Sequence, residues 1–264
     1  MSARSTFKVP DEVREVLMRS AVTATSVKLP SDQLERKLYE KVNKVLTGSG
    51  GKWDRKSGTH IFDRDPREAM GLAVEQGQAI NLRTKLQAFY TPPKLAGQVV
   101  EAAKLKHGML VLEPSAGEGA LVSAALRVAA VNVVMYDLDE VALARAVVVA
   151  DKVIFGSGGQ ARAEVQDFLM VVPASKFDAV LMNPPFTGGA DMIHVSHAWR
   201  FVKPGGILVA IMSPSWRTAN SKAAVTFRRV VTSAVASEVE KIPAGTFEHT
   251  NIATIVVTLR KGTN

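Results

Sequence analysis

From Gln87 onward, short apolar stretches alternate with segments long enough to form helices. The apolar stretches are typical of buried strands, because they are short and are bounded by glycine, proline or polar residues. They are Met109–Glu113, Val131–Tyr136, Ala161–Val165, Ala179–Met182, Gly206–Met212 and Ile252–Leu259. Helix-length segments such as Gly119–Val128 and Glu140–Ala150 separate them. The alternation predicts an α/β fold, in which a mostly parallel sheet carries helices on both faces and binds ligands at the carboxyl ends of its strands.

The chain has 264 residues, of which 47% are hydrophobic and 22% are charged, as expected for a globular protein with a large core. No apolar run reaches the roughly 18 residues that span a membrane, and the first residues lack the apolar core of a signal peptide. We therefore expect a cytoplasmic protein with no membrane partner. The absence of cysteine excludes disulfides, thiolate metal sites and a cysteine nucleophile.

The net charge is +8, and residues 1–90 contribute +5 of it through 16 basic and 11 acidic side chains. A basic excess of this size suits a polyanionic partner such as a nucleic acid. Charge alone favours such a partner and simple solubility about equally.

Residues 1–88 carry weaker and more mixed signals than the rest of the chain. We predict here a small basic α+β module, separate from a second domain over 89–264. Its expected elements are helices over Asp11–Arg19, over Ser31–Leu46 with Ser31 as N-cap and from Pro66 to about Glu75, and a hairpin over 52–62 that turns at Ser57-Gly58.

Trp53 lies in the expected hairpin among Lys52, Arg55 and Lys56. Basic side chains around an aromatic ring suit contact with DNA. The alternative is that Trp53 only packs against the Ser31–Leu46 helix.

The segment V-L-E-P-S-A-G-E-G-A-L (111–121) predicts a strand, a glycine turn and the start of a helix. Gly117 and Gly119 would let the backbone approach a ligand, and the helix N-terminus offers free N–H groups. Asp137 ends the next strand, twenty residues after Gly117, where a carboxylate can hold the two hydroxyls of a ribose. Together these features indicate a ligand that contains adenosine.

The turn differs from the loops that bind phosphates. It matches neither G-x-x-x-x-G-K-[ST] nor G-x-G-x-x-G, and Glu113 and Glu118 would repel a pyrophosphate. An acidic turn favours a ligand with cationic groups. S-adenosylmethionine (SAM) fits this description, because it carries an ammonium and a sulfonium and no phosphate.

Five motifs now stand in order along residues 87–260: F-Y-T-P-P-K-L-A (89–96), E-P-S-A-G-E-G (113–119), Asp137, V-Q-D-F (165–168) and N-P-P-F (183–186). In combination they resemble the class I SAM-dependent methyltransferases and, within that class, the adenine-N6 DNA methyltransferases. The resemblance implies a Rossmann-like fold with a mostly parallel seven-stranded sheet.

The resemblance also implies a role for each matched residue. The methionine end of SAM would contact Tyr90, Thr91 and Pro92, and its methionine and sulfonium portion would be wrapped by Glu113, Pro114, Ser115, Ala116, Gly117 and Gly119. Asp137 would hold the ribose, Asp167 the adenine amino group, and Phe168 or Leu138 the adenine ring, with Asn183 beside the cofactor.

Several of these residues have plainer alternatives. Asp167 can equally cap the end of its strand, and Thr91 can be a turn residue before Pro92. Asp139 is expected to cap a helix. His194 and His197 could share a helix face, but no third ligand is evident, so we expect no metal.

In M-N-P-P-F the apolar run of the fourth strand stops at Asn183. The resemblance makes this corner catalytic: Asn183 Oδ1 and the Pro184 carbonyl would accept the hydrogens of an exocyclic amine and localise its lone pair. Pro184 and Pro185 fix φ and so hold the carbonyl in place, and Phe186 can stack on the base. A rigid turn is the alternative, and it is disfavoured by the position of the corner beyond a matched SAM loop.

The expected substrate is double-stranded DNA whose target adenine is flipped out of the stack. Gly188-Gly189 would let the adjoining loop move during that step. No segment is long enough for a large target-reading domain, so we expect little sequence specificity, for example in a restriction-modification setting. The alternatives are an RNA methyltransferase, a protein glutamine methyltransferase, and a nucleic-acid-binding module with a vestigial SAM fold.

Two further segments could meet the substrate. The segment S-P-S-W-R (213–217) has two interpretations: it lines the base pocket, or it is a structural turn. The basic residues that follow it could meet phosphates or simply be solvated; they are Arg217, Lys222, Arg228 and Arg229.

Overall fold

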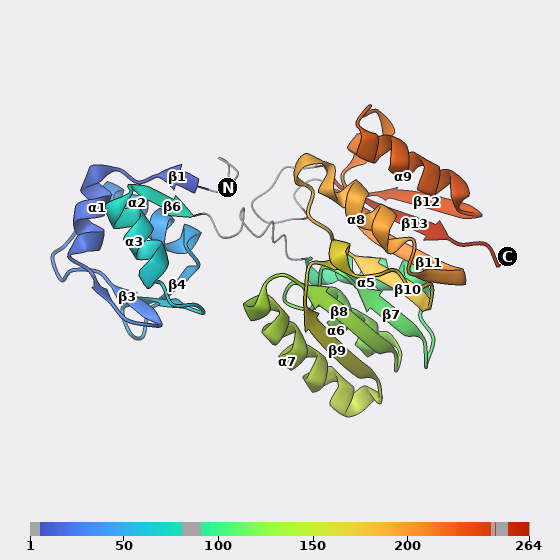
Figure 1. Ribbon diagram of the computed structural model, residues 1–264. Helices are drawn as coiled ribbons and strands as arrows, with labels where there is room; N and C mark the ends of the chain where they lie inside the picture. Colours follow the sequence, from blue (N-terminus) through green and yellow to red (C-terminus); the bar gives the residue numbers. More distant parts are fainter. Residues whose placement is uncertain (1–5, 81–90, 244–245, 247–252, 264) are drawn as a thin grey trace. The chain divides into compact units, whose positions relative to one another are not determined.

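The computed structural model describes residues 6–80, 91–243, 246 and 253–263 (Figure 1). The chain divides into two compact units, Met1–Ala88 and Phe89–Asn264. In the described part, no helix is long and apolar enough to cross a membrane.

Over its described residues, 6–80, the first unit combines three helices with short antiparallel strands. Its helices are α1 (Asp11–Met18), α2 (Arg36–Gly48) and α3 (Arg67–Glu75). A four-stranded sheet has the order β2-β3-β5-β4, built from β2 (Ala21–Val22), β3 (Ser26–Lys28), β4 (Gly51–Asp54) and β5 (Thr59–Phe62). A separate pair joins β1 (Thr6–Lys8) to β6 (Gln78–Ile80).

The expected hairpin is confirmed, because β4 pairs with β5 in an antiparallel register. The helix expected after Pro66 is also confirmed. The start expected at Ser31 is wrong: α2 begins at Arg36, after Glu35. In the preceding segment Asp32 instead forms an ion pair with Arg19, the C-cap residue of α1.

The second unit is built on a seven-stranded sheet with the order β12-β13-β11-β10-β7-β8-β9 (Figure 1). Its strands are β7 (Leu110–Glu113), β8 (Asn132–Asp137), β9 (Gln160–Val165), β10 (Phe177–Met182), β11 (Val202–Met212), β12 (Ala236–Lys241) and β13 (Ile255–Arg260). Strand β13 pairs antiparallel with both of its neighbours, β11 and β12, and the other strand pairs of this sheet are parallel. The mostly parallel Rossmann-like sheet is therefore confirmed.

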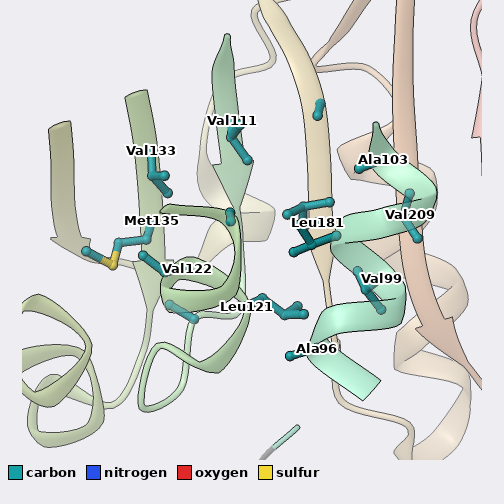
Figure 2. Close-up of a cluster of buried hydrophobic side chains, with 14 of the residues drawn as sticks. Ala96, Val99, Ala103, Val111, Leu121, Val122, Val133, Met135, Leu181 and Val209 are labelled. Atoms are coloured by element: carbon teal, nitrogen blue, oxygen red, sulfur yellow. The ribbon is translucent and has the colours of Figure 1, made fainter. Parts of the chain in front are cut away.

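Helices cover both faces of this sheet. One core cluster joins it to α5 (Pro93–Ala103), α6 (Ala120–Val128) and α7 (Glu140–Ser157), and Figure 2 shows part of that cluster. A second cluster joins the other face to α8 (Ala190–Ala198) and α9 (Lys222–Ser233). Along β10, Ala179 and Leu181 belong to the first cluster, whereas Val180 and Met182 belong to the second. Because successive side chains point to opposite faces, burial on both faces explains the continuous apolar run from Ala179 to Met182.

The edge strand β12 was not among the expected strands. Its sequence, A-S-E-V-E-K, leaves every side chain exposed except the partly buried Val239. An edge strand with one weakly covered face has no continuous apolar run, so the sequence pattern does not reveal it. The last strand begins at Ile255, whereas the expected start, Ile252, lies outside the described residues.

Candidate active site

Four of the expected site residues follow four neighbouring strands of the sheet. Asn183 follows β10, Glu113 ends β7, Asp137 ends β8 and Asp167 follows β9. These strands are adjacent and parallel, so their carboxyl ends share one edge. The fold thus brings the motifs into one row along the edge where such sheets bind ligands.

The glycine turn after β7 is bonded directly to the end of β8. Gly117 has a positive φ of 52° and donates its backbone N–H to Asp137 Oδ2 at 2.7 Å. Ala116 N–H donates to the carbonyl of Tyr136 at 3.0 Å. The other carboxylate oxygen of Asp137 accepts the N–H of Asp139 at 2.8 Å. The expected proximity of the turn and Asp137 is therefore present as a hydrogen-bonded unit.

Besides the expected approach of the backbone to a ligand, the packing of Gly119 against α7 requires a glycine, which the motif did not indicate. Its φ is 84°, and a Cβ built on it would lie 2.8 Å from the Cα of Ala146 in α7. Real Cβ contacts are essentially never this short. Glycine at 119 is therefore required for the close packing of the turn against α7.

Two carboxylates lie at or beside the turn, the buried Glu113 and the partly buried Asp137. Glu113 is 2% exposed and accepts the N–H of Ser115 at 3.0 Å, and burial raises its pKa well above the ordinary value. Burial also raises the pKa of Asp137. In the described part of the chain, neither carboxylate forms an ion pair with a basic side chain. A cationic ligand with a ribose fits this arrangement, because it supplies the charge and the hydroxyl donors that these two carboxylates favour.

Glu118 was expected to repel a phosphate group, but its negative charge is paired within the protein. Its carboxylate pairs with Arg145 of α7, which offsets its charge. The acidic character of the turn therefore comes from Glu113. The neighbouring Pro114 is buried and Ser115 is partly exposed.

The expected adenine-binding residues have distinct surroundings. Asp167 accepts the N–H of Leu169 at 2.9 Å and caps the short helix η1 (Phe168–Met170), which is the strand-end cap given as its alternative. Phe168 is 2% exposed and packs against Phe201 and His197, with ring centroids 5.0 and 4.9 Å away. Phe168 thus packs within the core, and the role expected of it beside an adenine ring stays a prediction. Leu138, at 67% exposure, offers an accessible side chain instead.

The N-P-P-F corner is connected to the segment that precedes the first strand of the sheet. Asn183 Nδ2 donates to Thr91 Oγ1 at 3.1 Å, and Thr91 is 8% exposed. Thr91 is therefore more than a turn residue. Pro92 follows it as the N-cap of α5, while Tyr90 lies outside the described residues.

The rest of the corner is well packed. Pro184 is buried, Pro185 is partly exposed, and Phe186 is 8% exposed within the core cluster on the α5–α7 face. Gly188 and Gly189 follow with φ values of 68° and 81°, which carry the chain from the corner into α8.

Two residues of α8, the helix that follows the corner, bond to other parts of the fold. Asp191 is fully buried and accepts the backbone N–H of Ser213 at 2.9 Å; no sequence motif marked it. His197 contacts the Val171 carbonyl through Nε2 at 3.1 Å. Among the described residues, no group of three or more histidine or acidic side chains could hold a metal ion.

Comparison with known proteins agrees with this geometry. Residues 98–238, more than half of the chain, match the family described as the methyltransferase small domain. No curated protein gives a significant match.

Solved structures share the fold. A Listeria monocytogenes protein assigned to the class I SAM-dependent methyltransferases has a TM-score of 0.55 and 16% identity over 74% of this chain and 66% of its own. The methyltransferase subunit of a Streptococcus thermophilus type I restriction-modification system has a TM-score of 0.53 and 23% identity over 66% of this chain and 44% of its own. A Pyrococcus horikoshii protein assigned as an RNA methyltransferase has a TM-score of 0.50 and 20% identity over 68% of this chain and 90% of its own.

This chain thus spans less than two thirds of the first two of these proteins. The match over residues 98–238 includes the glycine turn, the ends of β7, β8 and β9, and the N-P-P-F corner. The chain belongs to the methyltransferase small domain family.

Proposed function

We propose that this methyltransferase transfers the methyl group of SAM to the exocyclic N6 amine of adenine in DNA, with little sequence specificity. The observation that carries the proposal is the position of Asn183. It follows β10 directly beside β7, whose end bears the glycine turn, and its amide is held by Thr91. An amide fixed next to a SAM-binding turn can orient an amine toward the methyl donor.

The cofactor would lie along the row of strand ends. We assign the ribose to Asp137, the methionine portion to the turn from Glu113 to Gly119 and to Thr91, and the adenine to Leu138 and Asp167. When bound, SAM supplies an electrophilic methyl group on a sulfonium. The buried carboxylate of Glu113 would stabilise the positive charge of this ligand, since it has no basic partner of its own among the described residues.

The corner would act on the target amine by accepting hydrogen bonds. Asn183 Oδ1 and the Pro184 carbonyl would each accept one N–H, which localises the nitrogen lone pair and directs it at the methyl group. The two prolines fix the backbone, so the acceptors need little reorganisation during the reaction. We assign base stacking to Phe186, which directly follows the two prolines and is 8% exposed at the edge of the core. The amine loses its extra proton to solvent after transfer, so no tuned general base is required.

We propose that the first unit supplies contacts to DNA through the β4–β5 hairpin. Asp54 accepts the N–H and hydroxyl of Ser57 at 2.9 and 2.6 Å, which orders the turn. Arg55 and Lys56 on that turn are exposed and form no ion pair within the described residues. Beside them Trp53 is 47% exposed, its ring centroid 5.1 Å from that of His60. An ordered turn with two cations and a half-exposed indole is suited to a phosphate backbone.

Little sequence specificity is expected because the site has few surrounding segments. Between β10 and β11 the chain holds only η2 (Thr187–Gly189) and α8. Contacts to phosphate position a protein on DNA without selecting a sequence, and base readout would have to come from the first unit.

RNA is the second candidate substrate, and it is favoured by the similarity to the Pyrococcus protein assigned as an RNA methyltransferase. The similarity to a restriction-modification subunit favours DNA. A protein glutamine amide is a third candidate, because N-P-P-[FY] corners can orient any planar amine or amide.

The test is to incubate the protein with labelled SAM and, separately, duplex DNA, RNA and ribosomal protein. We expect label in DNA, and N6-methyladenine as the modified nucleoside after digestion. Label confined to RNA or to protein would reject the DNA assignment, and the neighbours of the modified base would measure the specificity.

A further inference from the structure

The loop after β11 is anchored at three separate points. Its first residue, Ser213, donates its backbone N–H to the buried Asp191 at 2.9 Å. The Ser213 hydroxyl accepts the N–H of Ser215 at 3.2 Å and caps the short helix η3 (Pro214–Arg217). Arg228 of α9 donates to the carbonyls of Trp216 and Ala219 at 2.6 and 2.8 Å. A buried carboxylate and a half-buried arginine are thus both used to fix one short loop.

This loop leaves the sheet beside the N-P-P-F corner. Strands β10 and β11 are parallel neighbours, and Met182 is in register with Ala210. Pro184 lies two residues after Met182, and Met212, the last residue of β11, lies two residues after Ala210. Asp191, which holds the loop, lies in the first turn of the helix that follows the corner. The anchored loop and the corner therefore follow adjacent strands at the same edge of the sheet.

The loop presents an arginine to solvent. Trp216 is 8% exposed, and its ring meets Phe227 edge-on with centroids 5.2 Å apart. The guanidinium carbon of Arg217 lies over the Trp216 ring, 5.6 Å from its centroid. Arg217 is exposed and has no acidic partner in the described part of the chain. Contact with a ring uses none of the five N–H donors of a guanidinium, so these donors are left for an anion.

We propose that Arg217 binds the phosphodiester of the nucleotide whose base enters the N-P-P-F corner. The inference rests on the proposed function and adds the group that would select a polynucleotide over an isolated amine or amide. A guanidinium held on a rigid ring loses little freedom on binding, and its planar fork matches the geometry of a phosphate. The phosphodiester is common to DNA and RNA, so the inference concerns the backbone and not the sugar.

The test compares Arg217→Ala with Arg200→Ala as a matched control. Both remove one exposed positive charge, but Arg200 precedes β11 and Arg217 follows it, so they lie at opposite edges of the sheet. Binding of labelled duplex DNA, and of RNA of the same sequence, would be measured by fluorescence anisotropy over a range of salt concentrations. Thermal melting and SAM affinity would be measured for both variants.

We expect Arg217→Ala to weaken polynucleotide binding roughly tenfold and to reduce the slope of log affinity against log salt by about one. Melting and SAM affinity should stay at parental values, and Arg200→Ala should leave all four quantities unchanged. Arg217→Lys should restore the salt slope, because it restores the charge. An unchanged slope and affinity in Arg217→Ala would overturn the inference.

Methyl transfer, measured separately, distinguishes the two claims. A parent protein that binds DNA with the expected dependence on Arg217 but leaves its adenines unmodified would reject the proposed function and support the inference. An Arg217→Ala variant that methylates DNA with parental KM and salt dependence would reject the inference alone. A parent that binds neither DNA nor RNA would reject both.

Discussion

Asn183 and Thr91 are joined by a hydrogen bond of 3.1 Å from the asparagine amide to the threonine hydroxyl, across 92 positions of the chain. The bond determines which way the planar amide faces, since its nitrogen is turned toward Thr91. It also connects Thr91, which lies two residues before the start of α5, to the corner at the end of β10. A residue expected to touch only the cofactor therefore positions the residue expected to orient the substrate.

Replacing Thr91 by valine should lower kcat roughly tenfold, because the amide of Asn183 loses the bond that orients it. The isosteric change keeps the packing of this nearly buried side chain. Thr91→Ser keeps the hydroxyl and serves as the control, with kcat near the parental value. Steady-state kinetics on the preferred polynucleotide would measure kcat for both variants. Equal kcat values for the valine and serine variants would contradict a positioning role.

Replacing Asn183 by alanine should reduce kcat at least about 100-fold, as expected when a preorganised polar group is removed from a reacting site. SAM affinity, measured by calorimetry, should be nearly parental. Asn132→Ala is the control, because Asn132 starts β8 at the opposite edge of the sheet. If Asn183→Ala methylates DNA at a near-parental rate, the chemical role of the corner is wrong.

Replacing Gly119 by alanine should destabilise the protein by roughly 2–4 kcal/mol. The new Cβ would meet the backbone of Ala146, and the residue would keep a left-handed conformation that alanine disfavours. Gly97→Ala is the matched control: Gly97 lies exposed within α5 with nothing within 4 Å of its Cβ, so this change should stabilise by about 0.4–1 kcal/mol. Denaturant unfolding followed by circular dichroism measures both, and equal effects would contradict the packing account.

Glu113→Gln should make the cofactor-free protein more stable than the parent at neutral pH. Burial raises the pKa of Glu113, so between its ordinary and raised pKa the folded state holds more protons than the unfolded state. The parent therefore loses stability as the pH rises through that window, and the glutamine variant avoids this loss. Melting from about pH 5 to about pH 8 should show the gap widening with pH.

The same variant should bind SAM more weakly, because the ligand loses a buried negative charge. A gap in melting temperature that is constant with pH would indicate that Glu113 titrates in the folded protein as it does in the unfolded one.

Removing the two cations of the hairpin turn with Arg55→Ala and Lys56→Ala should reduce the salt slope of DNA binding by about two and leave kcat unchanged at saturating DNA. The control pair is Lys37→Ala with Lys44→Ala, which removes the same charge from the exposed side of α2. Equal losses in the two double variants would show that the first unit attracts DNA by its general charge and not through the hairpin.

The sequence alone predicted six of the seven strands of the sheet, the glycine turn and the corner. Strands β7, β8, β10 and β11 were visible because both of their faces are largely buried, which gives each strand a continuous apolar run. Asp137 could be matched to the turn because a fixed spacing separates the ends of neighbouring strands. The exposed edge strand β12 left no such pattern.

Tertiary structure alone decided which of the expected site residues are packed in the core and which are hydrogen-bonded to distant parts of the chain. Phe168 matched a motif, yet its ring is enclosed by His197 and Phe201, while Thr91 and Asp191 became important through partners far along the chain. A local sequence pattern indicates which side chains of a helix or strand face the core. It carries no information on which distant element covers that side chain, because this depends on the order of the strands in the folded sheet.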